Sequence, residues 1–309
     1  MTRRDLLKPA AVGVTLLGLG GLSPKAFANH SNSGSGLVPA FEGDEPVPVR
    51  EGLGIVIVGA SSGMGAELAR QYAAHGAYIV LAARRTDRLN DVAAEVANLG
   101  GFARVVITDV RNEQECIDLI QDSISWLAEN GKVIDILALA PIRSLLGAFG
   151  PEISTEVWRN VIDTNYFGPA FCLQHAIPHL KDNASTVFYF NSISSSVGTP
   201  FVSAYAASKH AWQGIMKAMK FENPELTVVS SQFNAVDTEA FDKELTFKND
   251  DKRYCPSFFK TYSTPASQMY PEPIAIAIEK VVQAIESQTT NAFLRLYPIL
   301  ATSRHHVTR

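Results

Sequence analysis

Tyr205 and Lys209 stand four residues apart in the segment Tyr205-Ala-Ala-Ser-Lys209. On an α-helix this spacing puts both side chains on one face, one turn from each other. An ammonium beside a phenol favours the phenolate and therefore lowers the pKa of the tyrosine, which is about 10 in isolation. A tyrosine tuned in this way can donate or accept a proton in a reaction. The spacing is common by chance, so it indicates acid–base chemistry only in combination with other residues.

A serine-rich turn follows an apolar run upstream of this pair. Ser192 ends the segment Phe188-Tyr-Phe-Asn-Ser192 and lies 13 residues before Tyr205. A hydroxyl near such an acid can hydrogen-bond a carbonyl oxygen and stabilise the charge that develops on it. Ser194 and Ser195 are alternatives for this role, and the spacing favours Ser192.

Three glycines in the segment Gly59-Ala-Ser-Ser-Gly63-Met-Gly65 could serve a phosphate site. Glycine lets the backbone turn sharply and approach a pyrophosphate, which free N–H groups at a helix N-terminus then hold. An apolar run over 53–58 precedes the loop, and apolar residues at helical spacing over 64–75 follow it. This context favours a dinucleotide-binding loop over a purely structural turn.

The next predicted strand, 78–83, ends in Ala83 and is followed by Arg84 and Arg85. An enzyme that prefers NAD places Asp or Glu at this strand end to bind the adenosine ribose. Ala83 carries no carboxylate that would repel a 2′-phosphate, and Arg84 could pair with that phosphate through two hydrogen bonds. We therefore expect NADP(H) as the cofactor; the alternative is a solvated arginine pair that opens a helix.

Strands and helices alternate from Leu53 onward. Continuous apolar runs are typical of strands buried on both faces, and apolar residues at helical spacing separate these runs. The predicted strands are 53–58, 78–83, 103–107, 133–139, 186–191, 226–232 and 292–297. The predicted helices are 64–75, 86–99, 112–129, 153–180, 203–220 and 272–287. This alternation predicts one α/β domain over 51–309 with a doubly wound parallel sheet.

The segment 237–271 interrupts that alternation with aromatic residues, charges and prolines. A loop of this length in a compact domain usually covers a site, so we expect a lid over an apolar substrate. Surface packing or a dimer contact is the alternative.

The first 28 residues have the order of an export signal. Arg3 and Arg4 precede the apolar run 9–22, which is short for a bilayer core of about 30 Å, and Ala26-Phe27-Ala28 offers a peptidase site. This order resembles a bacterial twin-arginine signal. We expect 29–50 to be a flexible linker and the mature chain to be periplasmic, without stable insertion in a membrane. A cytoplasmic or N-terminally anchored protein is the alternative.

The composition excludes several classes of protein. The 309 residues are 46% hydrophobic and 19% charged, which is typical of a folded domain rather than a disordered chain. The formal net charge of −4 provides no basic footprint, so nucleic acid is not an expected partner. The three cysteines are widely spaced and lie near no His or Cys at ligand spacing, so we expect neither a disulfide framework nor a metal site.

Together these motifs resemble the classical short-chain dehydrogenase/reductase superfamily over about Leu53 to Tyr297. Within it the chain is similar to 11β-hydroxysteroid dehydrogenase type 1-like enzymes, whose strand-end Ala-Arg and Ser-to-Tyr spacing it shares. The resemblance implies a single Rossmann-type sheet flanked by helices and association as a homodimer or homotetramer. It implies a catalytic set made of Asn165, Ser192, Tyr205 and Lys209.

The resemblance also assigns roles to individual residues. Asn165 lies in Asp163-Thr-Asn-Tyr-Phe-Gly168, which matches the segment where the family's asparagine bends a helix and holds a water of the proton relay. Asp109-Val110 matches the adenine-contacting pair, and Thr238 matches the position that contacts the nicotinamide carboxamide. The implied cofactor-binding residues are Gly59, Ser61, Ser62, Gly63, Met64, Gly65, Arg84, Asp109, Val110, Asn165, Tyr205, Lys209, Val236 and Thr238.

Two segments depart from the family pattern. Leu139-Ala-Pro-Ile142 stands where the family has Asn-Asn-Ala-Gly, so side chains that brace the cofactor loop are missing. Phe233-Asn234 stands where the family has Pro-Gly. Asn can adopt the left-handed conformation that glycine provides, so the turn at 234 can be kept.

These observations predict an NADP(H)-dependent oxidoreductase that interconverts a secondary alcohol and a ketone or aldehyde on a small apolar molecule, steroid-like or otherwise hydrophobic. Tyr205 would donate the proton to the carbonyl oxygen, and Ser192 would hydrogen-bond that oxygen. Lys209 would lower the pKa of Tyr205 and hold the ribose hydroxyls. The alternatives are a non-catalytic dinucleotide-binding sensor and an envelope interaction protein built on the same scaffold.

Overall fold

The computed structural model describes residues 47–144, 149–151, 153–198, 202–233, 274–287 and 293–296. The strands are β1 (Gly54–Val58), β2 (Tyr78–Ala83), β3 (Phe102–Ile107), β4 (Ile136–Leu139), β5 (Thr186–Ser192), β6 (Thr227–Phe233) and β7 (Phe293–Leu296). The α-helices are α1 (Gly63–Ala73), α2 (Thr86–Asn98), α3 (Glu113–Glu129), α4 (Thr155–Ile162), α5 (Gly168–Asp182), α6 (Ser203–Glu222) and α9 (Ile274–Glu286). The described residues also include the π-helix η2 (Asp163–Phe167) and the 3₁₀-helix η3 (Ile193–Ser195).

The seven strands form one parallel sheet in the order β3-β2-β1-β4-β5-β6-β7. The chain moves outward from β1 in one direction, then returns to β4 on its other side. The predicted doubly wound α/β sheet is therefore confirmed. In such a sheet the carboxyl ends of the strands around this reversal form the crevice where ligands bind.

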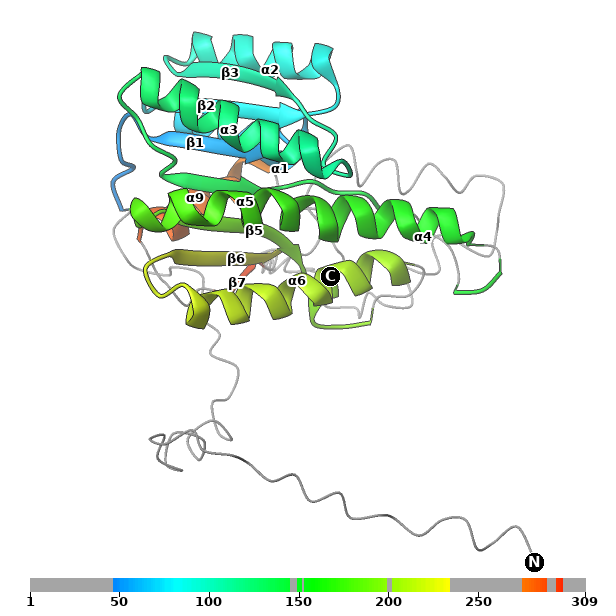
Figure 1. The fold of residues 1–309 in the computed structure, drawn as a ribbon. Coiled ribbons are helices and arrows are strands. Elements are labelled where there is room, and N and C mark those ends of the chain that lie inside the picture. The colour runs from blue at the N-terminus through cyan, green and yellow to red at the C-terminus, as the bar shows by residue number, and fades with distance from the viewer. Residues whose placement is uncertain are drawn as a thin grey trace, which may run out of the picture. The chain divides into compact units, whose positions relative to one another are not determined.

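Helices cover both faces of the sheet (Figure 1). Side chains of α1, α2 and α9 pack with one set of strand residues, and side chains of α3, α5 and α6 pack with the other set. Every residue of β1, β4 and β5 is buried, which explains the apolar runs 55–58, 136–139 and 187–190 in the sequence. β3 lies at the sheet's edge, and its side chains are all at least partly exposed.

The long predicted helix 153–180 is divided into three parts in the structure. It begins as α4, passes through the π-turn η2 and continues as α5. A π-turn adds one residue to the turn and so rotates the residues that follow it, and such turns are frequent at functional sites. The turn contains Asn165, whose side chain is fully buried.

Residues 47–50, at the end of the predicted linker, are held against α9. Val47 N–H donates to Gln283 Oε1 at 2.7 Å, and Gln283 Nε2 donates back to the Val47 carbonyl at 3.2 Å. Arg50 Nε donates to the fully buried carboxylate of Glu286 at 2.8 Å, and the Tyr72 hydroxyl donates to that carboxylate at 2.8 Å. This part of the linker is therefore bound to the domain.

Several sequence predictions concern segments outside the described residues. These are the signal at 1–28, the linker residues 29–46, the lid at 237–271, and Val236 and Thr238. They remain predictions. Within the described part of the chain, no helix has the length and apolar character needed to cross a membrane.

We predict that Glu286→Leu lowers the free energy of unfolding by about 2–3 kcal/mol, because the Tyr72 hydroxyl then stays buried without its acceptor. The double variant Tyr72→Phe/Glu286→Leu should recover part of this loss, since the buried hydroxyl is then gone while Arg50 still lacks its carboxylate. Urea unfolding followed by circular dichroism measures both variants. A double variant less stable than Glu286→Leu would contradict this account of the contact.

Candidate active site

The glycine-rich loop between β1 and α1 has the backbone that the sequence predicts. Gly59 has a φ of +92° and Gly63 a φ of +59°, both in the left-handed region that favours glycine. A Cβ on Gly65 would stand 2.6 Å from the Gly59 carbonyl oxygen, so the helix packs against the loop without room for a side chain. Two of the three glycines thus permit turns, and the third permits close packing.

The N-terminus of α1 is suited to an anion. No acidic residue stands in its first turn, and the N-cap residue Ser62 makes no capping bond from its side chain. The first N–H groups of a helix have no partner within the helix, and the helix dipole favours negative charge there. This terminus, with Met64 in its first turn, can hold a phosphate at the carboxyl end of β1.

Arg84 and Arg85, which follow β2, have different surroundings. Arg85 donates to the Ser61 hydroxyl from Nη2 at 3.0 Å and from Nε at 3.2 Å, and it also donates to Ser62. Arg85 thus holds the glycine-rich loop through its two serines. Arg84 is exposed to solvent, close enough to Asp109 for its charge to be one of the influences that lower the pKa of that carboxyl group. The amino-acid sequence alone does not reveal this role of Arg85, because hydrogen bonds to serines 23 and 24 residues away leave no local pattern.

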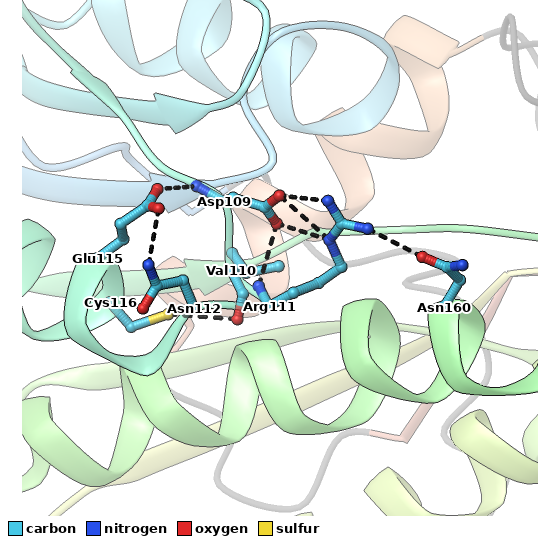
Figure 2. A network of polar contacts seen from close by, with 7 residues as sticks. All are labelled: Asp109, Val110, Arg111, Asn112, Glu115, Cys116 and Asn160. Atoms are coloured by element: carbon cyan, nitrogen blue, oxygen red, sulfur yellow. Dashed lines mark hydrogen bonds and ion pairs between the residues drawn. The ribbon is translucent and has the colours of Figure 1, made fainter. Parts of the chain in front are cut away.

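Asp109, which follows β3, is held in place by Arg111 (Figure 2). Arg111 Nε donates to both carboxylate oxygens of Asp109, at 2.9 and 3.1 Å, and its Nη1 donates to Asn160 Oδ1 at 2.9 Å. The hydrogen bonds from Arg111 hold the pKa of Asp109 below its ordinary value, so this group is ionised at neutral pH. The N–H and Nη2 of Arg111 donate to this carboxylate as well, so four contacts from Arg111 engage its about four lone-pair sites.

The neighbouring Val110 packs beneath this network, between α3 and α5. Val110 is buried, and a Cβ on Gly168 at the start of α5 would stand 2.5 Å from its Cγ2. Cys116 on α3 is also buried there, with its Sγ 3.5 Å from the Val110 carbonyl oxygen. Val110, which follows Asp109, is therefore closely packed between α3 and α5.

Asn165 ties the π-turn to the segment after β4. Its Oδ1 accepts from the Arg143 N–H at 2.7 Å, and its Nδ2 donates to the Arg143 carbonyl at 2.8 Å. Nδ2 also lies 3.2 Å from the Ser208 hydroxyl on α6. The side-chain amide of Asn165 therefore pairs with both main-chain groups of Arg143 and holds the segment after β4 against η2.

The departure at Leu139-Ala-Pro-Ile142 is met by direct backbone packing. A Cβ on Gly59 would stand 2.7 Å from the carbonyl carbon and oxygen of Ala140 and 2.8 Å from the Pro141 nitrogen. The loop and the post-β4 segment are therefore in contact through main-chain atoms. This contact braces the glycine-rich loop without the asparagine side chains of the family pattern.

Ser192 lies at the last position of β5 and begins the turn η3. Its hydroxyl accepts from the Ser194 N–H at 3.2 Å, and its N–H donates to Asn191 Oδ1 at 2.9 Å. Ser195 is less exposed, and its hydroxyl accepts from Gln232 Nε2 at 3.0 Å within the core. Ser192 lies at the strand end, as the spacing predicts. Ser195 is instead hydrogen-bonded to Gln232 of β6.

Tyr205 and Lys209 lie one turn apart on α6. Tyr205 is half-buried, and the Lys209 ammonium nitrogen is 5.7 Å from the centre of its ring. Lys209 is 2% exposed, and its Nζ donates to the Phe190 carbonyl at 2.7 Å and to the Tyr189 hydroxyl at 3.0 Å. Burial lowers the pKa of Lys209 to about 7, because the charged ammonium is poorly solvated there.

The structure thus brings most predicted site residues to the carboxyl edge of the sheet. The glycine-rich loop follows β1, Asp109 follows β3, and Ser192 ends β5. Lys209 reaches β5 from α6 through its bonds to Tyr189 and Phe190. The fold and this loop define a Rossmann-type α/β protein, in which Tyr205 and Lys209 of α6 lie next to the end of β5.

Comparison with known proteins identifies the family. The family model described as short chain dehydrogenase matches residues 54–249, more than half of the chain and a range that includes Ser192, Tyr205 and Lys209. The chain belongs to the short chain dehydrogenase family, a family of oxidoreductases.

Two relatives illustrate the sequence similarity. An 11-beta-hydroxysteroid dehydrogenase-like protein 4A of Arabidopsis thaliana is 34% identical over 176 residues, which cover 56% of this chain and 58% of the relative. A dehydrogenase/reductase SDR family protein 7-like of Dictyostelium discoideum is 27% identical over 256 residues, 80% of this chain and 78% of the relative. The chain spans a little more than half the length of the first of these relatives.

Solved structures share the fold at low sequence identity. An alcohol dehydrogenase from the archaeon Thermococcus sibiricus, complexed with 5-hydroxy-NADP, superposes with a TM-score of 0.63 and 21% identity. That match covers 79% of this chain and 94% of the archaeal chain. A short-chain type dehydrogenase/reductase from Mycobacterium ulcerans superposes with a TM-score of 0.69 and 18% identity over 80% of this chain and 87% of that one.

We predict that Gly65→Ala destabilises the protein by about 1–3 kcal/mol, because the new methyl group meets the backbone of Gly59 and the loop must move. Gly214→Ala on α6 is the matched control, since nothing lies within 4 Å of its Cβ position. The control should gain up to about 1 kcal/mol from alanine's helix propensity. Urea unfolding measures both, and equal effects would show that the loop is not closely packed.

Proposed function

We propose that this protein is an NADP(H)-dependent oxidoreductase that interconverts a secondary alcohol and a ketone or aldehyde. The observation that carries the proposal is the Lys209 ammonium, buried in the core beside the ring of Tyr205. Burying an ammonium is costly, so it is found where its charge is paired or used. Here the charge faces the one tyrosine that the family pattern assigns to proton transfer.

In the reduction direction, Tyr205 gives its proton to the carbonyl oxygen of the substrate. The C=O double bond becomes a C–O single bond as the carbon accepts a hydride, which a bound nicotinamide cofactor supplies. The positive charge of Lys209 favours the phenolate that Tyr205 leaves behind. Ser192 hydrogen-bonds the same oxygen and stabilises its developing charge. Oxidation runs these proton steps in reverse.

The residues at the crevice fit a dinucleotide. The N-terminus of α1 and the glycine-rich loop would hold the pyrophosphate, and Asp109 with Val110 would border the adenine. An ammonium has three N–H donors, and the two hydrogen bonds to β5 leave one for a ribose hydroxyl. The absence of a carboxylate at the end of β2 and the presence of the exposed Arg84 support NADP(H) over NAD(H).

The substrate class rests on the lid sequence and on the relatives. Phe241, Phe247, Phe258 and Phe259 in 237–271 favour an apolar substrate. The names of plant relatives, such as 11-beta-hydroxysteroid dehydrogenase A of Sesamum indicum, support a hydrophobic alcohol or ketone. A substrate screen that follows NADPH absorbance tests this proposal. Cofactor binding without turnover would favour the dinucleotide-binding sensor, and no binding would favour the interaction protein.

The location of the protein is part of the proposal. Arg3 and Arg4 support export by a twin-arginine route, which carries folded proteins with their cofactor already bound. The test is periplasmic recovery of a chain that begins near Asn29 and carries nucleotide. Full-length chain found only in the cytosol would contradict this part of the proposal.

Replacing Tyr205 with phenylalanine should abolish turnover and leave NADPH binding nearly intact, because only the proton donor is lost. Tyr78→Phe is the matched control, since Tyr78 stacks on Phe102 at the far end of β2. Steady-state kinetics and cofactor fluorescence measure the two effects. If Tyr205→Phe kept more than about a tenth of kcat, the assignment of the acid would be wrong.

The two arginines after β2 should differ in their effect on cofactor choice. Arg84→Ala should weaken NADPH by about 10- to 150-fold and NADH little, because only NADPH has the 2′-phosphate. Arg85→Ala should weaken both cofactors, because Arg85 braces Ser61 and Ser62 in the shared loop. Fluorescence titration with each nucleotide measures all four affinities. Equal weakening of both cofactors by Arg84→Ala would rule out its contact with the 2′-phosphate.

A further inference from the structure

Tyr189 is a buried tyrosine next to the proposed acid–base pair. It lies on β5, is fully buried, and stacks on Trp212 of α6 with ring centres 4.5 Å apart and planes 14° apart. Its hydroxyl oxygen is 3.0 Å from Lys209 Nζ, which donates to it. The hydroxyl in turn points to the main-chain carbonyl of Asn165 in the π-turn, at 3.4 Å.

The hydroxyl therefore stands between the ammonium and the π-turn. A phenol hydroxyl can accept one hydrogen bond and donate another at the same time, as a water molecule does. Unlike water, it is fixed by its own ring, which the Trp212 stack immobilises.

We propose that Tyr189 is a positioning residue of the site, whose hydroxyl fixes the Lys209 ammonium and links it to the Asn165 carbonyl. This inference rests on the proposed function for its consequence in catalysis, and on the geometry alone for the contact. Nothing in the pattern of catalytic motifs assigns a role to position 189.

The electrostatic surroundings explain why this hydroxyl matters to Lys209. The groups that face its Nζ are the Tyr189 hydroxyl and Phe190 carbonyl from β5 and the Tyr205 ring from α6, with the Asn165 carbonyl behind Tyr189. None of these groups is a carboxylate, so the charged form is stabilised by neutral acceptors. Losing one of these two hydrogen-bond acceptors should therefore destabilise the charged form of Lys209 relative to the neutral amine.

The direction of the hydrogen bonds indicates that Tyr189 positions the Lys209 ammonium and does not transfer protons. Burial raises the pKa of Tyr189 well above its ordinary value, so the phenol stays protonated. Its proton points to a carbonyl oxygen, which has no proton to pass on. The path from Lys209 through Tyr189 thus ends at Asn165, and the hydroxyl serves to orient and stabilise the ammonium.

Tyr189→Phe isolates the hydroxyl from the rest of the side chain. The phenylalanine ring keeps the stack on Trp212 and the contact between Lys209 Nζ and the ring, 4.5 Å from its centre. Tyr72→Phe is the matched control, because Tyr72 is also fully buried with a hydrogen-bonded hydroxyl, and its acceptor is Glu286 near the N-terminal segment.

The pKa of Lys209 is measured by NMR on the full chain with ¹³C-labelled lysine, and its resonance is assigned by its absence in Lys209→Met. In the wild-type chain we expect a pKa of about 7. Tyr189→Phe should lower it by about one pH unit, since a hydrogen-bond acceptor of the charged form is lost. Tyr72→Phe should leave it unchanged. An unchanged pKa in Tyr189→Phe would overturn the inference.

A kinetic measurement tests the consequence for catalysis. The alkaline limb of the pH–rate profile for carbonyl reduction should move to lower pH in Tyr189→Phe, because the ammonium is lost at lower pH. A lowered pKa of Lys209 in a chain without carbonyl turnover would overturn the proposed function and leave the contact standing. Turnover with an unshifted limb would overturn the role of Tyr189 alone.

If Tyr189→Phe does not fold, 3-fluorotyrosine is incorporated at position 189 instead. Fluorine keeps the hydroxyl and nearly the same shape but makes the oxygen a poorer acceptor. The pKa of Lys209 should then fall in the same direction by a smaller amount. No change would overturn the inference.

Discussion

The site depends on one buried charge, the ammonium of Lys209 on α6. Its burial requires acceptors at fixed positions, and β5 provides them through the Phe190 carbonyl and the Tyr189 hydroxyl. Because α6 is held to the end of β5 in this way, Tyr205 and Ser192 are brought to the same edge of the sheet. A charge in the core also makes its own pKa sensitive to each neighbouring dipole, and that sensitivity is what acid–base chemistry needs.

The glycine-rich loop is held in place by close packing of backbone atoms. Gly59 lies against Ala140 and Pro141, and Gly65 lies against Gly59, so the loop has little freedom. The two hydrogen bonds between the Asn165 side chain and the Arg143 backbone connect the segment after β4 to the π-helix η2. The family's asparagine side chains are absent at 139–142, and these main-chain contacts do the bracing instead.

Much of the fold and part of the site could be predicted from the sequence. Buried parallel strands are continuous apolar runs, so their order along the chain and the α/β class follow from local pattern. The glycine-rich loop and the Tyr205–Lys209 pair are also local, since each lies within seven residues. The π-turn divides the predicted helix 153–180, and apolar spacing did not reveal it because both sides remain helical.

What the sequence determined by itself is therefore the set of elements and the chemistry of their short motifs, because both depend on neighbours along the chain. The tertiary structure decided which groups surround them. Arg85 braces serines of another loop, and Tyr189 meets Lys209 from a different element. In the sequence, Tyr189 is one of several large apolar residues in the run that forms β5, and nothing distinguishes it from its neighbours. Only the packing of α6 and η2 against β5 places its hydroxyl between an ammonium and a carbonyl.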